Sequence, residues 1–255
     1  MAGSAALDKG AVTGADADLG IDLPPTGVIL PAGGMGLRAG GPEPKQFLPL
    51  RQGGRPMLAY AVEAFHALVC VKSIVLALPK DRLPAFAPLT GEFPKLRLVE
   101  GGPERWVSVR NAFQVLDPKL PYALVHDVAR PFVPAAVIRR CLEAVHPGAC
   151  AIAAVPSPDT VKEAADGVVT RTLDRRALIL VQTPQVFPRR VLETVYARTW
   201  SGDTPTDEAM MAEQAGFPVR WVMGSEASRK ITGASDLEWA RCMAGRLEAG
   251  ETIPD

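Results

Sequence analysis

Short apolar runs alternate along this chain with longer segments in which apolar positions recur every three or four residues. The short runs are typical of buried parallel strands, and they cover 28–30, 73–78, 96–99, 123–126 and 149–155. The segments 57–68 and 106–116 have the spacing of helices that cover a sheet. This order predicts an α/β fold with a doubly wound, mostly parallel sheet, helices on both faces and ligands at the carboxyl ends of the strands.

The alternation changes after residue 155. Two short segments rich in β-branched residues flank Asp166 and Gly167, a pattern typical of a β-hairpin. Because an isolated pair of strands is only marginally stable in water, we expect 156–176 to be an inserted arm that packs on a second subunit and makes the protein a homodimer. The alternative is a hairpin folded back on its own domain.

The remaining third of the chain returns to strands and helices. Strand patterns cover 177–182, 183–187 and 219–223, and helical patterns cover 189–198 and 206–215. Ser235 and Glu238 have the spacing of a capping box for a last helix. We expect one domain at 26–248, a small, acidic and disordered tail at 1–25, and a short tail at 249–255.

The composition excludes several classes of protein. Lysine plus arginine and aspartate plus glutamate both number 28, so no net basic field favours nucleic acid or a membrane as a partner. We therefore expect small-molecule substrates. The cysteines form no C-x-x-C pair and are typical of reduced, mostly buried thiols in a cytoplasmic protein, and the histidines lack zinc-ligand spacing.

A glycine-rich loop follows the first predicted strand. Gly33, Gly34 and Gly36 have no Cβ, so a ligand can approach the backbone N–H groups closely. Arg38 and Lys45 add positive charge beside them. This combination favours the binding of a polyphosphate.

The same loop also matches a different class of protein. Gly34, Gly36 and Ala39 fit the dinucleotide fingerprint of NAD-dependent oxidoreductases. That fingerprint needs a helix that begins at the third small residue, and Pro42 and Pro44 argue against such a helix.

Further candidates lie near other strand ends. Asp127 follows the run 123–126, where a carboxylate suits a metal ion or a hydroxyl group, although it could also cap a helix or pair with Arg130. Gly102 and Ser108 lie at a second junction between a loop and a helix, which could read the edge of a base. Lys230 follows the last predicted strand and could bind a second phosphate.

An ordered set of motifs runs through the chain from about residue 26 to residue 244: PAGGMGLR, PKQF, GGPERWVSV, HDVARPF, PSPDTVKE, LDR, QTPQVF, TDEA and SRKIT. With these motifs the chain resembles the 2-C-methyl-D-erythritol 4-phosphate cytidylyltransferases of the non-mevalonate isoprenoid pathway. The resemblance implies a dimer and a reaction that depends on Mg²⁺ or another divalent cation. In the reaction that the resemblance implies, the phosphate of methylerythritol phosphate would attack the α-phosphorus of the co-substrate CTP, giving 4-diphosphocytidyl-methylerythritol and pyrophosphate. Ribitol-5-phosphate cytidylyltransferases, which share three of these elements, are the alternative within the class.

The resemblance also implies residue roles. The catalytic residues would be Arg38, Lys45 and Lys230. The nucleotide would be held by Ala32, Gly33, Gly34, Gly36, Gly102, Ser108 and Asp127. The polyol phosphate would be contacted by Asp127, Arg130, Thr160, Arg175, Thr183, Thr206 and Lys230, and Asp127 would also hold the metal. The residues that could reach across from the partner subunit are Thr160, Arg175 and Arg130.

Some positions depart from the pattern of the family that the chain resembles. Gly33 stands where a second alanine is more usual. Trp106 and Val107 precede Ser108 where polar residues are usual. We expect the bulk of Trp106 to affect the base pocket, whereas Gly33 should be sterically harmless.

Overall fold

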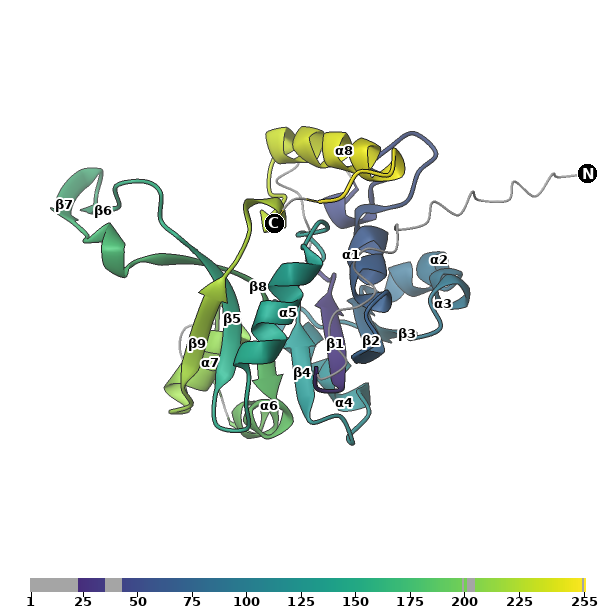
Figure 1. Cartoon of the computed structure of the whole chain (residues 1–255), viewed down its shortest axis with the longest axis horizontal. Helices are drawn as coiled ribbons and strands as arrows, with labels where there is room; N and C mark the ends of the chain where they lie inside the picture. The colour runs from purple at the N-terminus through teal and green to yellow at the C-terminus, as the bar shows by residue number, and fades with distance from the viewer. Residues whose placement is uncertain (1–22, 35–42, 199, 201–204, 254) are drawn as a thin grey trace, which may run out of the picture.

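A twisted sheet forms the centre of the chain. The computed structural model describes residues 23–34, 43–198, 200, 205–253 and 255, so the predictions for residues 1–22, Gly36 and Arg38 lie outside the described residues. The strands of the sheet are β1 (Thr26–Pro31), β2 (Val71–Leu78), β3 (Leu96–Glu100), β4 (Tyr122–Val125), β5 (Cys150–Pro156), β8 (Ile179–Pro188) and β9 (Val219–Met223). These seven strands are arranged in the order β3-β2-β1-β4-β8-β5-β9 (Figure 1).

The sheet is mostly parallel, as predicted. The strand β8 is antiparallel to both of its neighbours, β4 and β5, whereas the other pairs in the sheet are parallel. The chain leaves β5 for the arm and returns from the arm directly into β8. A chain that returns in this way without crossing the sheet must run antiparallel to the strand that it left.

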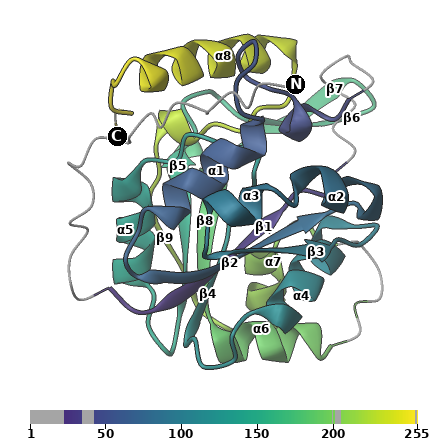
Figure 2. The same ribbon diagram turned by 90° about the vertical axis from the view of Figure 1, so that its right-hand side faces the viewer.

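Helices cover both faces of the sheet, which confirms the doubly wound fold. Val28 and Leu30 face a core that includes helices α1 (Met57–His66) and α5 (Ala135–Ala144). Ile29 faces the opposite core, which contains residues of α4 (Arg105–Val115), α6 (Arg189–Tyr196) and α7 (Glu208–Gln214). Alternate residues of one strand point to opposite faces, and Figure 2 shows α5 and α4 on opposite sides of the sheet. Both faces of β1 are therefore buried, and its sequence is a continuous apolar run.

The predicted hairpin is present as a separate two-stranded sheet. It consists of β6 (Lys162–Ala165) and β7 (Val168–Thr172). Asp166 and Gly167 connect the strands with φ angles of 49° and 80°, the positive values that a tight two-residue hairpin turn requires. All nine strand residues are exposed, and the hairpin projects away from the central sheet (Figure 1). It is not folded back onto its own domain.

The last helix, α8 (Ala234–Glu248), closes a third core at one end of the sheet (Figures 1 and 2). The predicted capping box was wrong by two positions. The helix is capped at Gly233, whose N–H donates to Asp236 Oδ2 over 3.0 Å, and the N–H and hydroxyl of Thr232 donate to the same oxygen. Asp236 can accept all three bonds because it lies in the first turn of α8, one turn from the incoming chain.

The remaining features are peripheral. Two short helices, α2 (Leu83–Phe86) and α3 (Leu89–Glu92), contact the edge strand β3. All four cysteines are free thiols, and three of them are buried, as the sequence predicts. Among the described residues, no helix combines the length and the apolar character that a membrane crossing needs.

Candidate active site at the carboxyl ends of the strands

Asp127 lies just beyond the carboxyl end of β4, and its backbone is held in place by a buried hydrogen-bond chain. Its N–H donates to Thr183 Oγ1 over 3.0 Å, and Thr183 Oγ1 lies 3.0 Å from His126 Nδ1. His126 Nε2 lies 3.0 Å from the carbonyl oxygen of Arg130. Because that carbonyl can only accept, Nε2 carries the proton of the neutral ring and the Thr183 hydroxyl donates to Nδ1. Burial lowers the pKa of His126 to about 4, so the ring is neutral.

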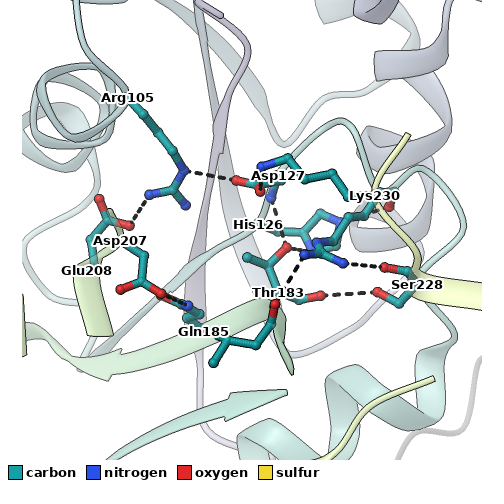
Figure 3. A network of polar contacts seen from close by, with 11 residues as sticks. Arg105, His126, Asp127, Thr183, Gln185, Asp207, Glu208, Ser228 and Lys230 are labelled. Carbon is teal, nitrogen blue, oxygen red and sulfur yellow. Dashed lines mark hydrogen bonds and ion pairs between the residues drawn. The ribbon is translucent and has the colours of Figure 1, made fainter. Parts of the chain in front are cut away.

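Two cations hold the carboxylate of Asp127 (Figure 3). Arg105 Nε lies 3.0 Å from Oδ1, and Lys230 Nζ lies 2.8 Å from Oδ2. Burial raises the pKa of Asp127, but the charges of Arg105 and Lys230 outweigh burial and hold the pKa well below its ordinary value. The carboxylate is therefore ionised. The sequence left open that Asp127 pairs with Arg130. In the structure the partners of its carboxylate are Arg105 and Lys230.

Arg105 also contacts a second carboxylate. Its Nη1 lies 2.6 Å from Oε2 of Glu208, a residue with no exposed surface at the start of α7. The neighbouring Asp207 caps α7 by accepting from the N–H of Met210, and it accepts a second bond of 2.8 Å from Gln185 Nε2. Arg105 lies in the motif GGPERWVSV, but the sequence analysis gives it no role, because an arginine in the first turn of a helix is usually solvated surface charge.

Arg130 lies in the cleft of its own chain. The residue is 9% exposed, and its Nη1 and Nη2 donate to the carbonyl oxygens of Ser228 and Val181 over 2.8 and 3.3 Å. The expectation that Arg130 reaches across to a partner subunit is therefore wrong. The sequence could not reveal these carbonyls, which come from segments 51 and 98 residues away.

One cavity of about 140 Å³ is lined by Arg105, Asp127, Arg130 and Lys230, among other residues. The cavity brings together five of the residues that the sequence predicts to be substrate-binding: Asp127, Arg130, Thr183, Thr206 and Lys230. The lining residues that the sequence reasoning missed are Arg105, Val181, Gln182, Gln185 and Asp207. Three cations face two carboxylates here, so the cavity suits a phosphorylated, hydroxyl-bearing ligand.

The two predicted nucleotide-binding loops lie side by side. A Cβ on Gly33 would lie 3.2 Å from Ser108 Oγ, and that oxygen accepts a 2.9 Å hydrogen bond from the N–H of Gly102. Gln46, which is 4% exposed, donates to the carbonyl oxygens of Ala32 and Gly34 over 3.0 and 2.5 Å. Gln46 therefore ties the described part of the first loop to the turn that carries Lys45. Gly33 leaves room that an alanine would fill only by moving Ser108.

Replacing Gly102 by alanine should destabilise the second loop. The new Cβ would lie 2.2 Å from Val107 Cγ1 and 2.6 Å from Val107 Cβ, and a β-branched side chain in a helix has little freedom to move away. We expect a loss of about 1–3 kcal/mol in the free energy of unfolding, measured by urea denaturation. The control is Gly91→Ala, where a Cβ meets nothing within 4 Å. Equal stabilities of the two variants would contradict the packing described here.

Some predicted residues are not in the cavity. Thr160 and Arg175 lie at the base of the arm, and Arg175 Nη1 donates to the carbonyl oxygen of Pro158 over 2.8 Å. Neither residue lines the cavity of its own chain. Lys45 lies in the 3₁₀ helix Lys45–Phe47, with 7% of its surface exposed.

Asp127 is also the residue that the sequence predicts to hold a metal ion. No group of three or more histidine, cysteine, aspartate or glutamate side chains that could hold a metal occurs in the part of the chain that the structure describes. Mg²⁺ usually takes one or two carboxylates and fills its remaining positions with phosphate oxygens and water. The ionised Asp127, at the wall of a cavity suited to phosphate, fits that limited role.

The fold and the cleft together define a doubly wound α/β protein with a cationic cleft for a phosphorylated ligand at its strand ends. The model of the 2-C-methyl-D-erythritol 4-phosphate cytidylyltransferase family matches residues 26–246. The chain belongs to this family. A 2-C-methyl-D-erythritol 4-phosphate cytidylyltransferase of Symbiobacterium thermophilum is 40% identical over 222 residues, covering 86% of this chain and 92% of the relative.

Two solved structures share the fold. The 2-C-methyl-D-erythritol 4-phosphate cytidylyltransferase of Thermus thermophilus is 32% identical with a TM-score of 0.66, and the match covers 87% of this chain and 99% of that chain. The 4-diphosphocytidyl-2C-methyl-D-erythritol synthase of Anaerococcus prevotii is 26% identical with a TM-score of 0.74, covering 89% and 98%. The resemblance found in the sequence motifs is therefore confirmed.

Proposed function

We propose that this chain transfers the cytidylyl group of CTP to 2-C-methyl-D-erythritol 4-phosphate and releases pyrophosphate. The observation that carries the proposal is the cavity in which Asp127, Arg130, Thr183, Thr206 and Lys230 meet, in a chain of this family. A phosphate oxygen of the polyol attacks the α-phosphorus of CTP, and the bond from that phosphorus to the bridging oxygen of pyrophosphate breaks.

The nucleotide binds along the two adjacent loops. Backbone N–H groups of Gly33 and Gly34 face the triphosphate, while the N–H of Ala32 donates to the carbonyl oxygen of Ala77 and fixes the start of the loop. Gly102 with Ser108 faces the base. Lys45 and Arg38, the second of which lies outside the described residues, stabilise charge that develops on the equatorial oxygens of the α-phosphate. These side chains position the reactants and neutralise charge, which is most of what a phosphoryl or nucleotidyl transfer needs.

The polyol phosphate binds in the cavity. Lys230 and Arg130 supply charge for its phosphate, while Thr183, Thr206 and Asp127 supply hydrogen-bonding partners for its hydroxyl groups. The side chain of Lys230 is 43% exposed, so its ammonium group can leave Asp127 and bind a substrate phosphate with little loss of free energy. When bound, Mg²⁺ or another divalent cation would be held by Asp127 and would neutralise phosphate charge.

The arm completes the site from a second copy of the chain. Val168 and Val169 on β7 are 66% and 57% exposed, and an exposed two-stranded sheet gains stability when it packs on another surface. We propose a cytoplasmic homodimer in which Thr160 and Arg175 of one subunit approach the cavity of the other. This arrangement explains why two residues of the family motifs lie away from the cavity of their own chain.

The direct test is pyrophosphate release with CTP and Mg²⁺, with methylerythritol 4-phosphate or ribitol 5-phosphate offered in separate reactions. Turnover with methylerythritol phosphate is expected. Turnover with ribitol phosphate alone would identify the protein as a ribitol-5-phosphate cytidylyltransferase, the alternative within the class. Thermal stabilisation by CTP with Mg²⁺, and not by NAD(H), would exclude the oxidoreductase interpretation.

Replacing Arg175 by alanine should weaken the use of the polyol phosphate selectively. The arm carries the guanidinium into the cavity of the partner, so we expect a 10- to 100-fold rise in the KM for methylerythritol phosphate, roughly the loss of one charge-assisted contact. The KM for CTP should be unchanged. The matched control is Arg171→Ala, which removes an exposed arginine from β7 of the same arm. Weaker CTP binding in Arg175→Ala would show that this residue has been misplaced.

A further inference from the structure

Arg105 links two carboxylates that come from distant parts of the chain. It is the first residue of α4, and its guanidinium contacts Asp127 through Nε over 3.0 Å and Glu208 through Nη1 over 2.6 Å. Glu208 is 103 residues further along the chain. Figure 3 shows the guanidinium between the two acids. Two bonds at different edges of one rigid plane define its orientation.

Glu208 stabilises the position of this guanidinium. Its side chain has no exposed surface, and a buried carboxylate is costly unless it is paired. Burial raises the pKa of Glu208, and the charge of Arg105 opposes this rise. If Arg105 turned away, Glu208 would have to take up a proton or remain as an unpaired buried charge, and the free-energy cost of either change favours the observed position of Arg105.

Lys230 differs from Arg105 in this respect. It holds the other oxygen of Asp127, but its side chain is 43% exposed against 27% for Arg105. A flexible, half-exposed lysine can turn to an incoming phosphate. When it does so, Arg105 is the cation that still holds Asp127 Oδ1.

We infer that Arg105, anchored by Glu208, is a positioning residue that keeps the Asp127 carboxylate oriented toward the cavity when Lys230 moves to a substrate phosphate. This inference rests on the proposed function for its kinetic test. Arg105 acts through Asp127, whereas Glu208 acts through Arg105. Double-mutant cycles can measure whether each residue acts through the next one.

The kinetic test is a double-mutant cycle of Arg105→Gln and Asp127→Asn, with kcat/KM for methylerythritol phosphate as the readout. If Arg105 acts through Asp127, Arg105→Gln lowers kcat/KM about 10- to 100-fold in the wild-type background and less than about threefold in the Asp127→Asn background. Multiplication of the two single effects would overturn the inference. Arg105→Lys, which keeps the charge but cannot bridge both acids, should recover part of the activity.

A second cycle tests the anchor. Glu208→Gln should lower kcat/KM, and it should have little further effect once Arg105 is glutamine. The matched control is Arg55→Ala, because Arg55 also bridges two carboxylates, Glu63 at 3.2 Å and Glu92 at 3.3 Å, on the surface of the same fold. Arg55→Ala should leave kcat/KM unchanged. An equal kinetic loss in both arginine variants would mean that Arg105 is merely structural.

Crystal structures of Lys230→Ala and of the double variant Arg105→Gln/Lys230→Ala separate failure of the inference from failure of the proposed function. Both lack the lysine that holds Oδ2 of Asp127, so they reproduce the state in which Lys230 has turned away. We expect the Asp127 carboxylate to keep its wild-type orientation in Lys230→Ala and to leave it in the double variant, a readout that needs no activity. An unchanged carboxylate in the double variant would overturn the inference even if the enzyme is active. Absence of pyrophosphate release by the wild-type chain would overturn the proposed function alone.

Discussion

Asp127→Asn should abolish most of the activity and destabilise the fold. Asp127 is the carboxylate on which Arg105 and Lys230 converge at 3.0 and 2.8 Å, with the buried Arg130 nearby. Removing the negative charge leaves these cations facing each other. Breaking a buried ion pair from one side costs about 3–5 kcal/mol, and the side chain of Asp127 is only 11% exposed. We expect a loss near the lower end of this range because Lys230 can turn to solvent.

The two effects are measured separately. Urea denaturation gives the free energy of unfolding, and pyrophosphate release gives kcat/KM, which should fall by about a factor of 10³ or more if the proposed roles in substrate and metal binding are lost together. The control is Asp81→Asn, because Asp81 pairs with Arg82 at 3.4 Å but its side chain is 76% exposed. That variant should match the wild type in both measurements. An Asp127→Asn enzyme with full activity would contradict the candidate site itself.

Lys45→Ala should lower kcat about 10²- to 10³-fold, the usual cost of removing one transition-state donor. Lys45 lies in the 3₁₀ helix that follows the glycine loop and is 7% exposed. A charge in such a water-poor position interacts strongly with the negative charge that grows on the phosphate oxygens as the α-phosphorus is attacked. The KM for CTP should change only a few-fold, because the interaction is strongest in the transition state.

Single-turnover and steady-state measurements of pyrophosphate release check this split between kcat and KM. Lys72→Ala serves as the control, because Lys72 is exposed and donates to the carbonyl oxygen of Val69 far from the loops. If kcat of Lys45→Ala equals that of the wild type while the KM for CTP rises, Lys45 binds the ground state and does not stabilise the transition state.

Much of the fold could be predicted because its signals are local. The continuous apolar run of β1 reflects burial on both faces, since Val28 and Leu30 enter one core and Ile29 enters the other. Asp166 and Gly167 predicted the hairpin because few residue pairs accept positive φ at both positions of a tight turn. Asp127 was found because a polar residue directly after a buried strand must lie at the carboxyl edge of a parallel sheet.

Other features could not be predicted because their causes lie far apart in the chain. The pairing of Arg105 with Glu208 depends on α4 and α7 lying against the same face of the sheet. Arg130 stays in its own cleft because two carbonyl oxygens from β8 and from the segment before α8 meet its guanidinium there. The N-cap of α8 is Gly233, with Asp236 as the capping acid, and not Ser235 with Glu238. The path of the chain that enters the helix determines which acid can reach the N–H groups of Thr232 and Gly233.

Local periodicity and turn chemistry in this sequence therefore specify which segments are strands, helices and hairpin, and which residues lie at strand ends. Each of these signals depends only on residues that are close together in the sequence, so the sequence alone contains it in full. The partners of the charged side chains follow from the order of strands in the sheet and from the helices packed on it. Charge pairing is a contact in space between distant segments, so only the folded arrangement selects Arg105 and Lys230, among 28 basic residues, as the partners of Asp127.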